Sequence, residues 1–436
     1  MVNIALLTLI LKVRMKVFIK IVSALTGIIM SSTVFAATTI TFDAWMWSEP
    51  NFKPMVEAVV AAFEKENPDI KVEMRGGGWA ETRQKLLMRA AAGDAEDVMM
   101  LDAEWYYSLG SSGVLQDLNK IASKDFLADL DQGALGSLVV DGEQVAVPSA
   151  LTPWGFWTNQ ELMKKYNLKQ NETWDDVFDN CQTLKKAGAK AQIIHLFGMQ
   201  KGGPLEFTLW LYWNFNVYPM STENIKNKKT GLDVPEYRTM LSHLRKLSNN
   251  GCLVQFGGDG RNALSHFESV IHPDGPYVVG IARSSNPDKL AGDKIFNVMS
   301  VEKNPVLRKG DKPKVQGLGH AMAISAASDH QEEAMRFVEY WVSNEKAIDL
   351  YTTPMGAITP SMKGQNKRKS TVYNNPVHKG FLNNVLPYLQ PVPVIDDWHA
   401  CGKILSDSLH KAILTDDPIE DLVKMSDNTC SIILGL

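Results

Sequence analysis

Tryptophans and carboxylates follow three successive apolar segments near the start of the chain. Aromatic faces pack on the C–H faces of a sugar ring, and carboxylates accept hydrogen bonds from its hydroxyls. The three sets therefore predict a carbohydrate site if the segments end at one edge of a sheet. They are Trp45, Trp47 and Glu49 after residues 39–42, Trp79 after residues 70–74, and Asp102, Glu104 and Trp105 after residues 97–101.

The three apolar segments read as strands separated by two helical patterns. The first helical pattern opens at Pro54, and the second covers residues 80–92 with Gly93 as its C-cap. This β-α-β-α-β order predicts a doubly wound α/β lobe with right-handed crossovers. Because ligands bind beyond the carboxyl ends of strands in such sheets, the tryptophan-bearing turns are expected to converge.

Core packing is the competing interpretation for every tryptophan. We expect four of them to be core residues, and of Trp45 and Trp47 we expect one to point inward. The four expected core residues are Trp174, Trp210, Trp213 and Trp341.

A secreted glycosidase using Asp102 and Glu104 is the alternative function, although such enzymes need two carboxylates at a set separation across the scissile bond. The chain has no G-x-S-x-G, Walker A or H-E-x-x-H motif, and Gly317-Leu318-Gly319 lacks the third glycine of a dinucleotide loop. We therefore expect no catalytic residue, no metal and no cofactor. A polyamine or metal receptor would need a denser cluster of acids or histidines.

The N-terminus reads as an export signal. Lys16 and Lys20 precede the apolar residues 21–30, and small residues precede Ala36. We expect translation to start at Met15, cleavage to follow Ala36, and the mature chain to be periplasmic; an uncleaved anchor is the alternative. Losing residues 1–36 removes four basic and no acidic residues, which lowers the net charge from −4 to −8. Such a surface argues against nucleic acid as a partner.

Four cysteines lie in the mature part, at Cys181, Cys252, Cys401 and Cys430. An exported chain permits disulfides, and four cysteines allow three full pairings that spacing cannot separate. A Cys401–Cys430 bond would tie down the C-terminal tail; buried free thiols are the alternative.

The stretch "SALTPWGFWTN" begins at Ser149 and concentrates aromatic residues after a proline. Side chains alternate along a strand, so Trp154 and Phe156 share one face and Trp157 takes the other. We expect Thr152 and Trp154 to line the ligand site and Trp157 to be buried. Residues 315–325 then read as a late strand, followed by an amphipathic helix.

The chain resembles family 1 extracellular solute-binding proteins, the sugar receptors of ABC importers that include the maltose-binding protein. The resemblance covers most of the mature chain and rests on segments in a characteristic order. They are "FEKENPDIKVEM" (63–74), "DVMMLDAEWYYSLGSSGVLQDLN" (97–119), "VAVPSALTPWGFWTN" (145–159), "TWDDVFDNCQTLKK" (173–186), "DGPYVVGI" (274–281), "GLGHAMAIS" (317–325), "FVEYWVSNEKA" (337–347) and "TPMGAITPS" (353–361).

The resemblance implies two doubly wound α/β lobes joined by a hinge that close around a ligand. It implies one lobe of residues 37–151 with 300–354 and another of 152–299 with 355–436. The implied partners are a carbohydrate and the membrane permease of an ABC importer, with the receptor a monomer. It adds ligand positions at Tyr277, where relatives often carry Trp, and at Glu206, Gly317, His320, Gly356 and Trp398.

The sugar itself stays open at this stage. Some relatives carry an Asp-Lys pair where this chain has "MWSEPN", so the role of Glu49 is open. Arg261 and Arg283, with His320, would suit an acidic sugar such as a uronate, because arginine pairs with carboxylate in bidentate fashion. The competing interpretation of Arg283 is an ordinary surface residue.

Overall fold

The computed structural model describes residues 37–102, 105–195, 208–253, 260–316, 319–390 and 398–436. The expected signal peptide therefore lies outside the described residues. So do three expected site residues, Glu104, Glu206 and Gly317.

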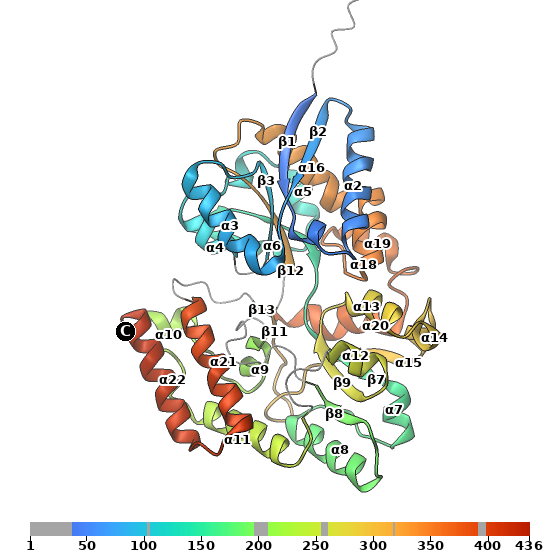
Figure 1. Cartoon of the computed structure of the whole chain (residues 1–436), viewed down its shortest axis with the longest axis vertical. Coiled ribbons are helices and arrows are strands. Elements are labelled where there is room, and N and C mark those ends of the chain that lie inside the picture. The colour runs from blue at the N-terminus through green and yellow to red at the C-terminus, as the bar shows by residue number, and fades with distance from the viewer. Residues whose placement is uncertain (1–36, 103–104, 196–207, 254–259, 317–318, 391–397) are drawn as a thin grey trace, which may run out of the picture. The chain divides into compact units, whose positions relative to one another are not determined.

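The first sheet has five strands in the order β2-β1-β3-β12-β6 (Figure 1). The early strands β1 (Thr38–Asp43), β2 (Ile70–Arg75) and β3 (Val98–Asp102) alternate with α2 (Lys53–Glu66) and α3 (Trp79–Ala92), which confirms the predicted β-α-β-α-β order. Strands β1 and β3 are parallel. The late strand β12 (Gly319–Ile324) lies antiparallel between β3 and β6 (Val147–Leu151), and α16 (Gln331–Ser343) follows it.

The second sheet has four strands in the order β10-β7-β9-β8. Here β7 (Gly155–Asn159) pairs antiparallel with both β10 (Met299–Glu302) and β9 (Ser269–Asp274), and only β8 (Gln192–Ile194) is parallel to its neighbour β9. This sheet is mixed, unlike the parallel one that a doubly wound lobe implies. Strand β7 thus pairs on both sides with strands from much later in the chain.

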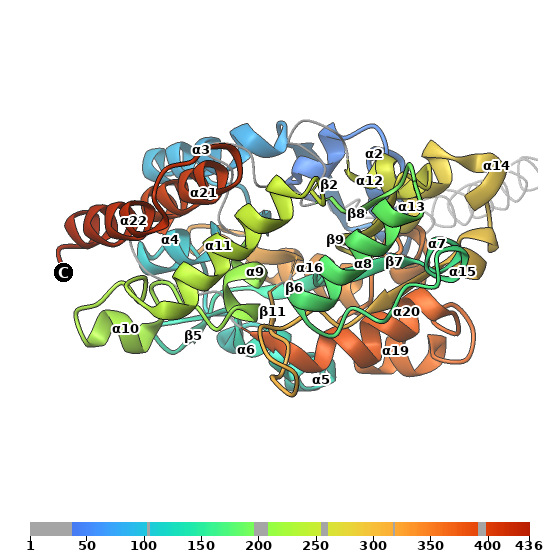
Figure 2. The same ribbon diagram turned by 90° about the horizontal axis from the view of Figure 1, so that it is seen from below.

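Four long helices share a hydrophobic core with strands of the second sheet. They are α8 (Trp174–Lys186), α11 (Pro235–Asn249), α21 (Trp398–Leu414) and α22 (Ile419–Leu434). The last two pack against each other, as Figure 2 shows from below. All four tryptophans expected in the core are buried there or in the first sheet's core, which confirms that prediction.

Shorter elements account for much of the remaining described chain. Before β9 they are α4 (Trp105–Ser111), α5 (Lys124–Asp129), α6 (Gln132–Gly136), β4 (Val139–Val140), β5 (Glu143–Gln144), α7 (Gln160–Lys165), α9 (Leu209–Asn214), α10 (Thr222–Lys226) and α12 (Gly260–Ser265). After β9 they are α13 (Val278–Ser285), α14 (Pro287–Leu290), α15 (Lys294–Val298), β11 (Val315–Gln316), α17 (Glu345–Ala347), α18 (Thr353–Met355), α19 (Met362–Arg368), α20 (Pro376–Gly380) and β13 (Leu389–Gln390).

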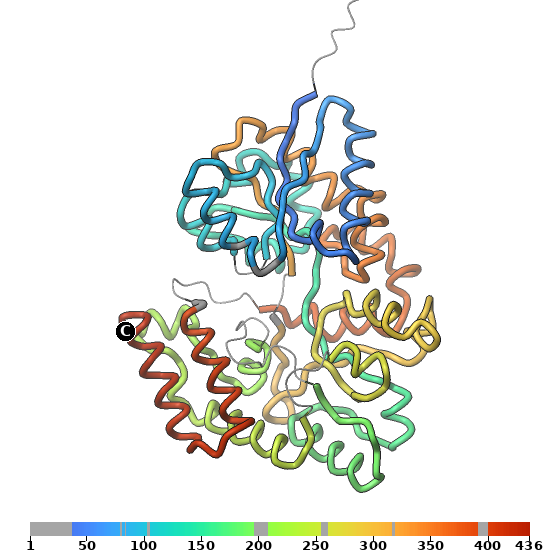
Figure 3. The backbone as a smooth tube through the Cα atoms, in the orientation of Figure 1, coloured from blue at the N-terminus to red at the C-terminus, as the bar shows by residue number. Residues whose placement is uncertain are grey.

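The chain passes from the first sheet to the second through only three residues, Thr152 to Trp154, between β6 and β7 (Figure 3). Trp154 and Phe156 belong to one core cluster and Trp157 to another, as the alternation of a strand requires. Trp157 is fully buried and its Nε1–H donates to the Gly275 carbonyl at 3.1 Å. The expected burial of Trp157 is therefore confirmed.

The later crossings fall at different residues from those expected. Strand β10 hydrogen-bonds in the second sheet, and Lys314 N donates to Asn214 Oδ1 at 3.0 Å, so the return lies after residue 316 and not at residue 300. Ile358 pairs with Leu151, and Ser361 Oγ donates to Asp129 at 2.6 Å. Residues 357–361 therefore stay with the first sheet, beyond the expected boundary at residue 354.

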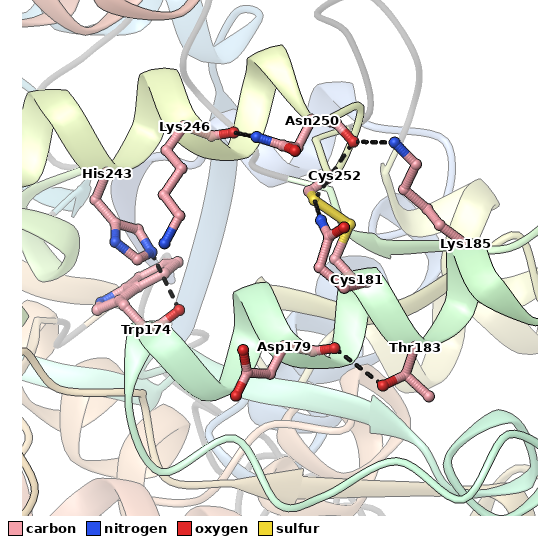
Figure 4. Close-up of a disulfide and its surroundings, with 10 residues drawn as sticks. Trp174, Asp179, Cys181, Thr183, Lys185, His243, Lys246, Asn250 and Cys252 are labelled. Atoms are coloured by element: carbon pink, nitrogen blue, oxygen red, sulfur yellow. Dashed lines mark hydrogen bonds between the residues drawn. A yellow bond between two sulfur atoms is a disulfide. The ribbon is translucent and has the colours of Figure 1, made fainter.

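One disulfide joins Cys181 of α8 to Cys252, which follows α11 (Figure 4). Next to it, Lys185 Nζ donates to the Asn250 carbonyl at 2.7 Å and fastens the same two segments. Cys401 and Cys430 are buried free thiols, and each Sγ donates to the carbonyl of the other residue at 3.8 Å, which joins α21 to α22. The suggested Cys401–Cys430 bond is therefore absent, and its stated alternative holds for this pair.

Removing the Cys181–Cys252 bond should lower the free energy of unfolding by about 2–4 kcal/mol, because it closes a long loop with a sequence separation of 71. Guanidinium unfolding of the oxidised protein and of the Cys181→Ala/Cys252→Ala variant measures this difference. A reductant should shift the wild-type midpoint and leave that of the double variant unchanged. Equal midpoints for both proteins would contradict a structural role for the bond.

His378 of α20 is a buried imidazole that fastens the last crossing. Its Nε2–H donates to the Gly356 carbonyl at 3.1 Å, and its ring stacks on Tyr373 at 5.1 Å. Burial lowers the pKa of His378 to about 4, with a smaller contribution from the positive charge of Arg283. The folded protein therefore holds this side chain neutral.

This histidine should make stability fall as the pH drops from about 6.5 to about 4. In that window His378 is protonated in the unfolded chain but not in the folded chain. This difference lowers the free energy of unfolding by up to roughly 3 kcal/mol. Urea unfolding across this range should show a weaker pH dependence in His378→Gln than in wild type. His266→Gln, at an exposed histidine, serves as the control and should keep the wild-type profile.

Candidate functional site

Asp102, His320 and Thr152 meet at one edge of the first sheet. Asp102 ends β3, and His320 stands directly opposite it on the antiparallel strand β12. Gly319 pairs with Leu151 at the end of β6 and has a left-handed φ of +80°. A Cβ on Gly319 would overlap Thr152 Oγ1, so glycine is what lets Thr152 lie against the start of β12.

Trp45 closes the inner side of this edge. Its ring meets the His320 ring edge-on, with centroids 5.0 Å apart. Burial lowers the pKa of His320, and the negative charge of Asp102 opposes that shift only in part. The site therefore presents a neutral imidazole beside a carboxylate, a pair that can both donate and accept hydrogen bonds.

A second polar group lies at the end of β9 in the second sheet. Asp274 is fully buried and pairs with Arg261 through Nε at 2.6 Å and with His272 Nε2 at 3.1 Å. The Gly275 N–H also donates to it, at 2.7 Å. Burial raises the pKa of Asp274, but the charge of Arg261 and the His272 bond outweigh it and hold that pKa well below its usual range.

This carboxylate holds the arginine that supports Tyr277. The Arg261 guanidinium lies 5.1 Å from the centroid of the Tyr277 ring, within cation–π distance. Burial raises the pKa of Tyr277 well above its usual value, and the charges of Asp274 and, more weakly, Asp102 act in the same direction. Tyr277 itself lies in the turn between β9 and α13, at the N-cap of that helix.

Gly356 lies against the same turn as Tyr277. Its φ is +81°, and a Cβ there would stand 2.8 Å from the Pro276 carbonyl oxygen and 3.0 Å from Val279 Cβ. The resemblance placed Gly356 and Tyr277 at the ligand site, and the structure brings these two together.

Other expected site residues pack against neighbouring protein residues or are buried. Trp47 is half-buried, donates from Nε1 to Glu57 at 3.3 Å and carries Lys53 over its ring at 5.0 Å. Trp45 is the more buried member of the early pair, which agrees with the expectation that one of the two points inward. Glu49 is half-buried beside them, and Trp105 and Trp154 are buried.

Two expected contacts are described only by their backbones. Trp79 begins α3 and Trp398 begins α21. Each therefore opens a helix, but the direction of its side chain stays a prediction.

Arg283 contacts residues that lie close to it in the sequence. Its Nε donates to the Gly292 carbonyl at 2.9 Å, and its guanidinium lies 5.2 Å from the centroid of the Phe296 ring. These contacts support the interpretation of Arg283 as a surface residue that braces α13 against α15.

Sequence reasoning left open which of Trp45 and Trp47 points inward, and it missed the whole group of Asp274 and His272. Asp274 ends a strand directly before Gly275, which was a usable signal because a strand-end carboxylate is what the first sheet also presents. In the described part of the chain, no group of three or more His, Cys, Asp or Glu side chains is arranged to hold a metal ion. No helix among those residues has the length and apolarity needed to cross a membrane.

Replacing Asp274 should remove the buried carboxylate that pairs with the Arg261 guanidinium. We expect Asp274→Asn to lower the free energy of unfolding by about 3 kcal/mol, because one half of a buried ion pair is removed. Asp288→Asn, at an exposed aspartate, is the matched control and should change stability little. Urea unfolding of both variants at neutral pH measures the difference, and equal stabilities would show that the pair contributes nothing.

Comparisons with known proteins identify the family and the fold of the chain. The chain is 21% identical over 369 residues to a putative binding protein of Brucella abortus, covering 83% of this chain and 85% of that one. It is 22% identical over 336 residues to the multiple sugar-binding protein of Streptococcus mutans, covering 72% and 74%.

The solved structure of the GacH receptor of Streptomyces glaucescens superposes with a TM-score of 0.77 at 19% identity, over 92% of this chain and 99% of that one. It shows that the fold is the two-lobed α/β fold of periplasmic binding proteins. The model of the family described as bacterial extracellular solute-binding protein matches residues 47–348. The chain therefore belongs to the bacterial extracellular solute-binding proteins, a family of receptors and not of enzymes.

Proposed function

We propose that this protein is a periplasmic receptor that captures a neutral mono- or oligosaccharide between its lobes and delivers it to the permease of an ABC importer. The observation that carries the proposal is the pairing of Asp102 with His320 at the strand ends of the first sheet. Capture by closure of two lobes is the common mechanism of such receptors.

The chemistry of the site suits hydroxyl groups. The Asp102 carboxylate accepts hydrogen bonds, while the His320 imidazole and the Thr152 hydroxyl can each donate or accept. The Tyr277 ring supplies a flat apolar face for the C–H side of a sugar. Trp47, Trp79, Glu104, Trp105, Trp154, Glu206, Gly317 and Trp398 remain proposed contacts.

The charges favour a neutral sugar over a uronate. Arg261 is already paired with the buried Asp274, and Arg283 donates to Gly292 and stacks on Phe296. Asp102 adds a negative charge that would repel a second carboxylate. An acidic sugar would therefore meet a carboxylate and no unpaired arginine from this pair.

The relatives support sugar capture for an importer. One is named a multiple sugar-binding protein, and the GacH receptor is described both unliganded and in complex with acarbose. A relative in Pyrococcus horikoshii, 32% identical over 162 residues, is named an ABC transporter extracellular-binding protein. The export signal, cleavage after Ala36 and the monomeric state belong to the proposal.

A neutral oligosaccharide should raise the melting temperature of the mature protein. At a hundred times its dissociation constant, a ligand that binds only the folded state stabilises it by about 2.7 kcal/mol. A thermal-shift screen of neutral maltooligosaccharides and of galacturonate oligomers measures this directly. Stabilisation by the uronates alone would overturn the preference for a neutral ligand, and no shift with any sugar would sink the proposal.

Asp102→Asn should lower the affinity for the sugar found in that screen by about tenfold or more, because hydrogen bonds to a charged group contribute roughly 1.5–3 kcal/mol. Asp94→Asn makes the same chemical change at an exposed residue and should bind as wild type does. Isothermal titration of both variants gives the comparison. An unchanged affinity in Asp102→Asn would remove Asp102 from the site.

A further inference from the structure

A polar cavity of about 560 Å³ lies beside the second sheet, apart from the residues discussed so far. Its walls come from the loop before α8, from residues 302–313 after β10, and from Asn384 and Tyr388. This volume lies within the range of small-molecule sites in proteins. Most of the lining side chains are polar, which distinguishes the cavity from an apolar packing defect.

Asn304 is the unusual member of the lining. Its side chain is 2% exposed, and neither Oδ1 nor Nδ2 has a hydrogen-bond partner among the described residues. Buried amides are almost always paired, and an unpaired one is unfavourable. Asn304 thus lines the cavity with an amide whose acceptor and donor are both unpaired within the described residues.

The groups around Asn304 leave the cavity close to electrically neutral. Lys309 Nζ pairs with Glu172 at 3.2 Å, and Glu302 accepts from Ser300 Oγ at 2.8 Å. Asn384 Nδ2 donates to the Val301 carbonyl at 3.0 Å, which fixes its amide at the wall. A small ion of either sign would thus gain little here, whereas a neutral polar ligand would keep these bonds intact.

Tyr388 adds the only aromatic ring of the described lining. Lys303 Nζ stands 5.4 Å from the centroid of this ring. An aromatic ring beside an amide is a combination that suits a sugar, whose C–H face packs on the ring while its hydroxyls reach the amide. Two adjacent hydroxyls match Asn304, because one can donate to Oδ1 while the other accepts from Nδ2.

We propose that this cavity is a second carbohydrate site, which takes one or two neutral sugar units through a vicinal diol on Asn304. It does not depend on the site at Asp102. The walls include the segment that leads into β11 and the segment that leads into β13, and these two strands pair with each other. A sugar bound there touches both segments at once.

The test uses the mature protein titrated with glucose and with maltose by isothermal calorimetry, in wild type and in Asp102→Asn. Asp102→Asn should weaken the first site, so binding that keeps its wild-type affinity in this variant is expected from the second site. Adding Asn304→Leu should reduce this residual affinity at least tenfold, since leucine fills a similar volume but offers neither donor nor acceptor. Asn366→Leu, the same change at an exposed residue of α19, is the matched control and should leave it intact.

Tyr388→Leu provides an independent variant should Asn304→Leu fail to fold, and it should weaken the same residual binding. The second site is overturned if Asp102→Asn shows no residual sugar binding, or if crystals soaked in maltose hold only water on Asn304. Loss of all binding in Asn304→Leu with none lost in Asp102→Asn would instead keep the second site and refute the first.

Discussion

The insertion of β12 between β3 and β6 is the constraint on which the rest of the structure depends. A strand from residues 319–324 completes a sheet begun by residues 38–43, so the chain must leave the first sheet and return to it. The exit at Thr152 and the return at Gly319 then lie against each other. This geometry sets His320 opposite Asp102, although 217 residues separate them in the sequence.

Asp97 holds this arrangement from the other end of β3. Its carboxylate accepts from the Thr41 N–H at 2.7 Å, from Thr41 Oγ1 at 2.8 Å and from Ser328 Oγ at 2.5 Å. Burial raises the pKa of Asp97, but these hydrogen bonds more than offset it and lower that pKa overall. One side chain therefore links β1, β3 and the turn after β12. It helps to fix the strands whose opposite ends carry the candidate site residues.

The early sheet was predictable from sequence because each of its elements carries its own local signal. Period-2 alternation marked β2, Pro54 opened α2, and Gly93 ended α3 in a left-handed conformation. The crossing points were not predictable to a few residues, because nothing local in residues 299–302 shows that β10 pairs with β7. Likewise, the Cys181–Cys252 bond depends on the packing of α8 against α11, which cysteine spacing does not encode.

Candidate site residues were easier to name than to orient. Asp102 and His320 stand where strand-end reasoning and the family resemblance placed them, since both belong to strands of fixed register. Trp47 packs with Lys53 and Glu57 of α2, a contact that residue type alone cannot reveal. The cation–π contact of Arg261 with Tyr277 was also unpredictable from residue type, because it depends on the buried Asp274 that holds Arg261.

The placement of charge bears directly on what such a receptor can bind. Asp274 and Arg261 neutralise each other within the second sheet and its flanking helix, and Asp102 stands opposite a neutral His320 within the first. Neither group needs the opposite lobe to complete it, so motion of one lobe relative to the other breaks no buried ion pair of these two groups. The preference for the closed state must then come from the ligand, because a ligand shifts an equilibrium only by its differential affinity for the two states. The neutral, hydroxyl-rich ligand that we propose would meet this requirement, since it could bond to Asp102 and cover the Tyr277 ring without separating Arg261 from its carboxylate.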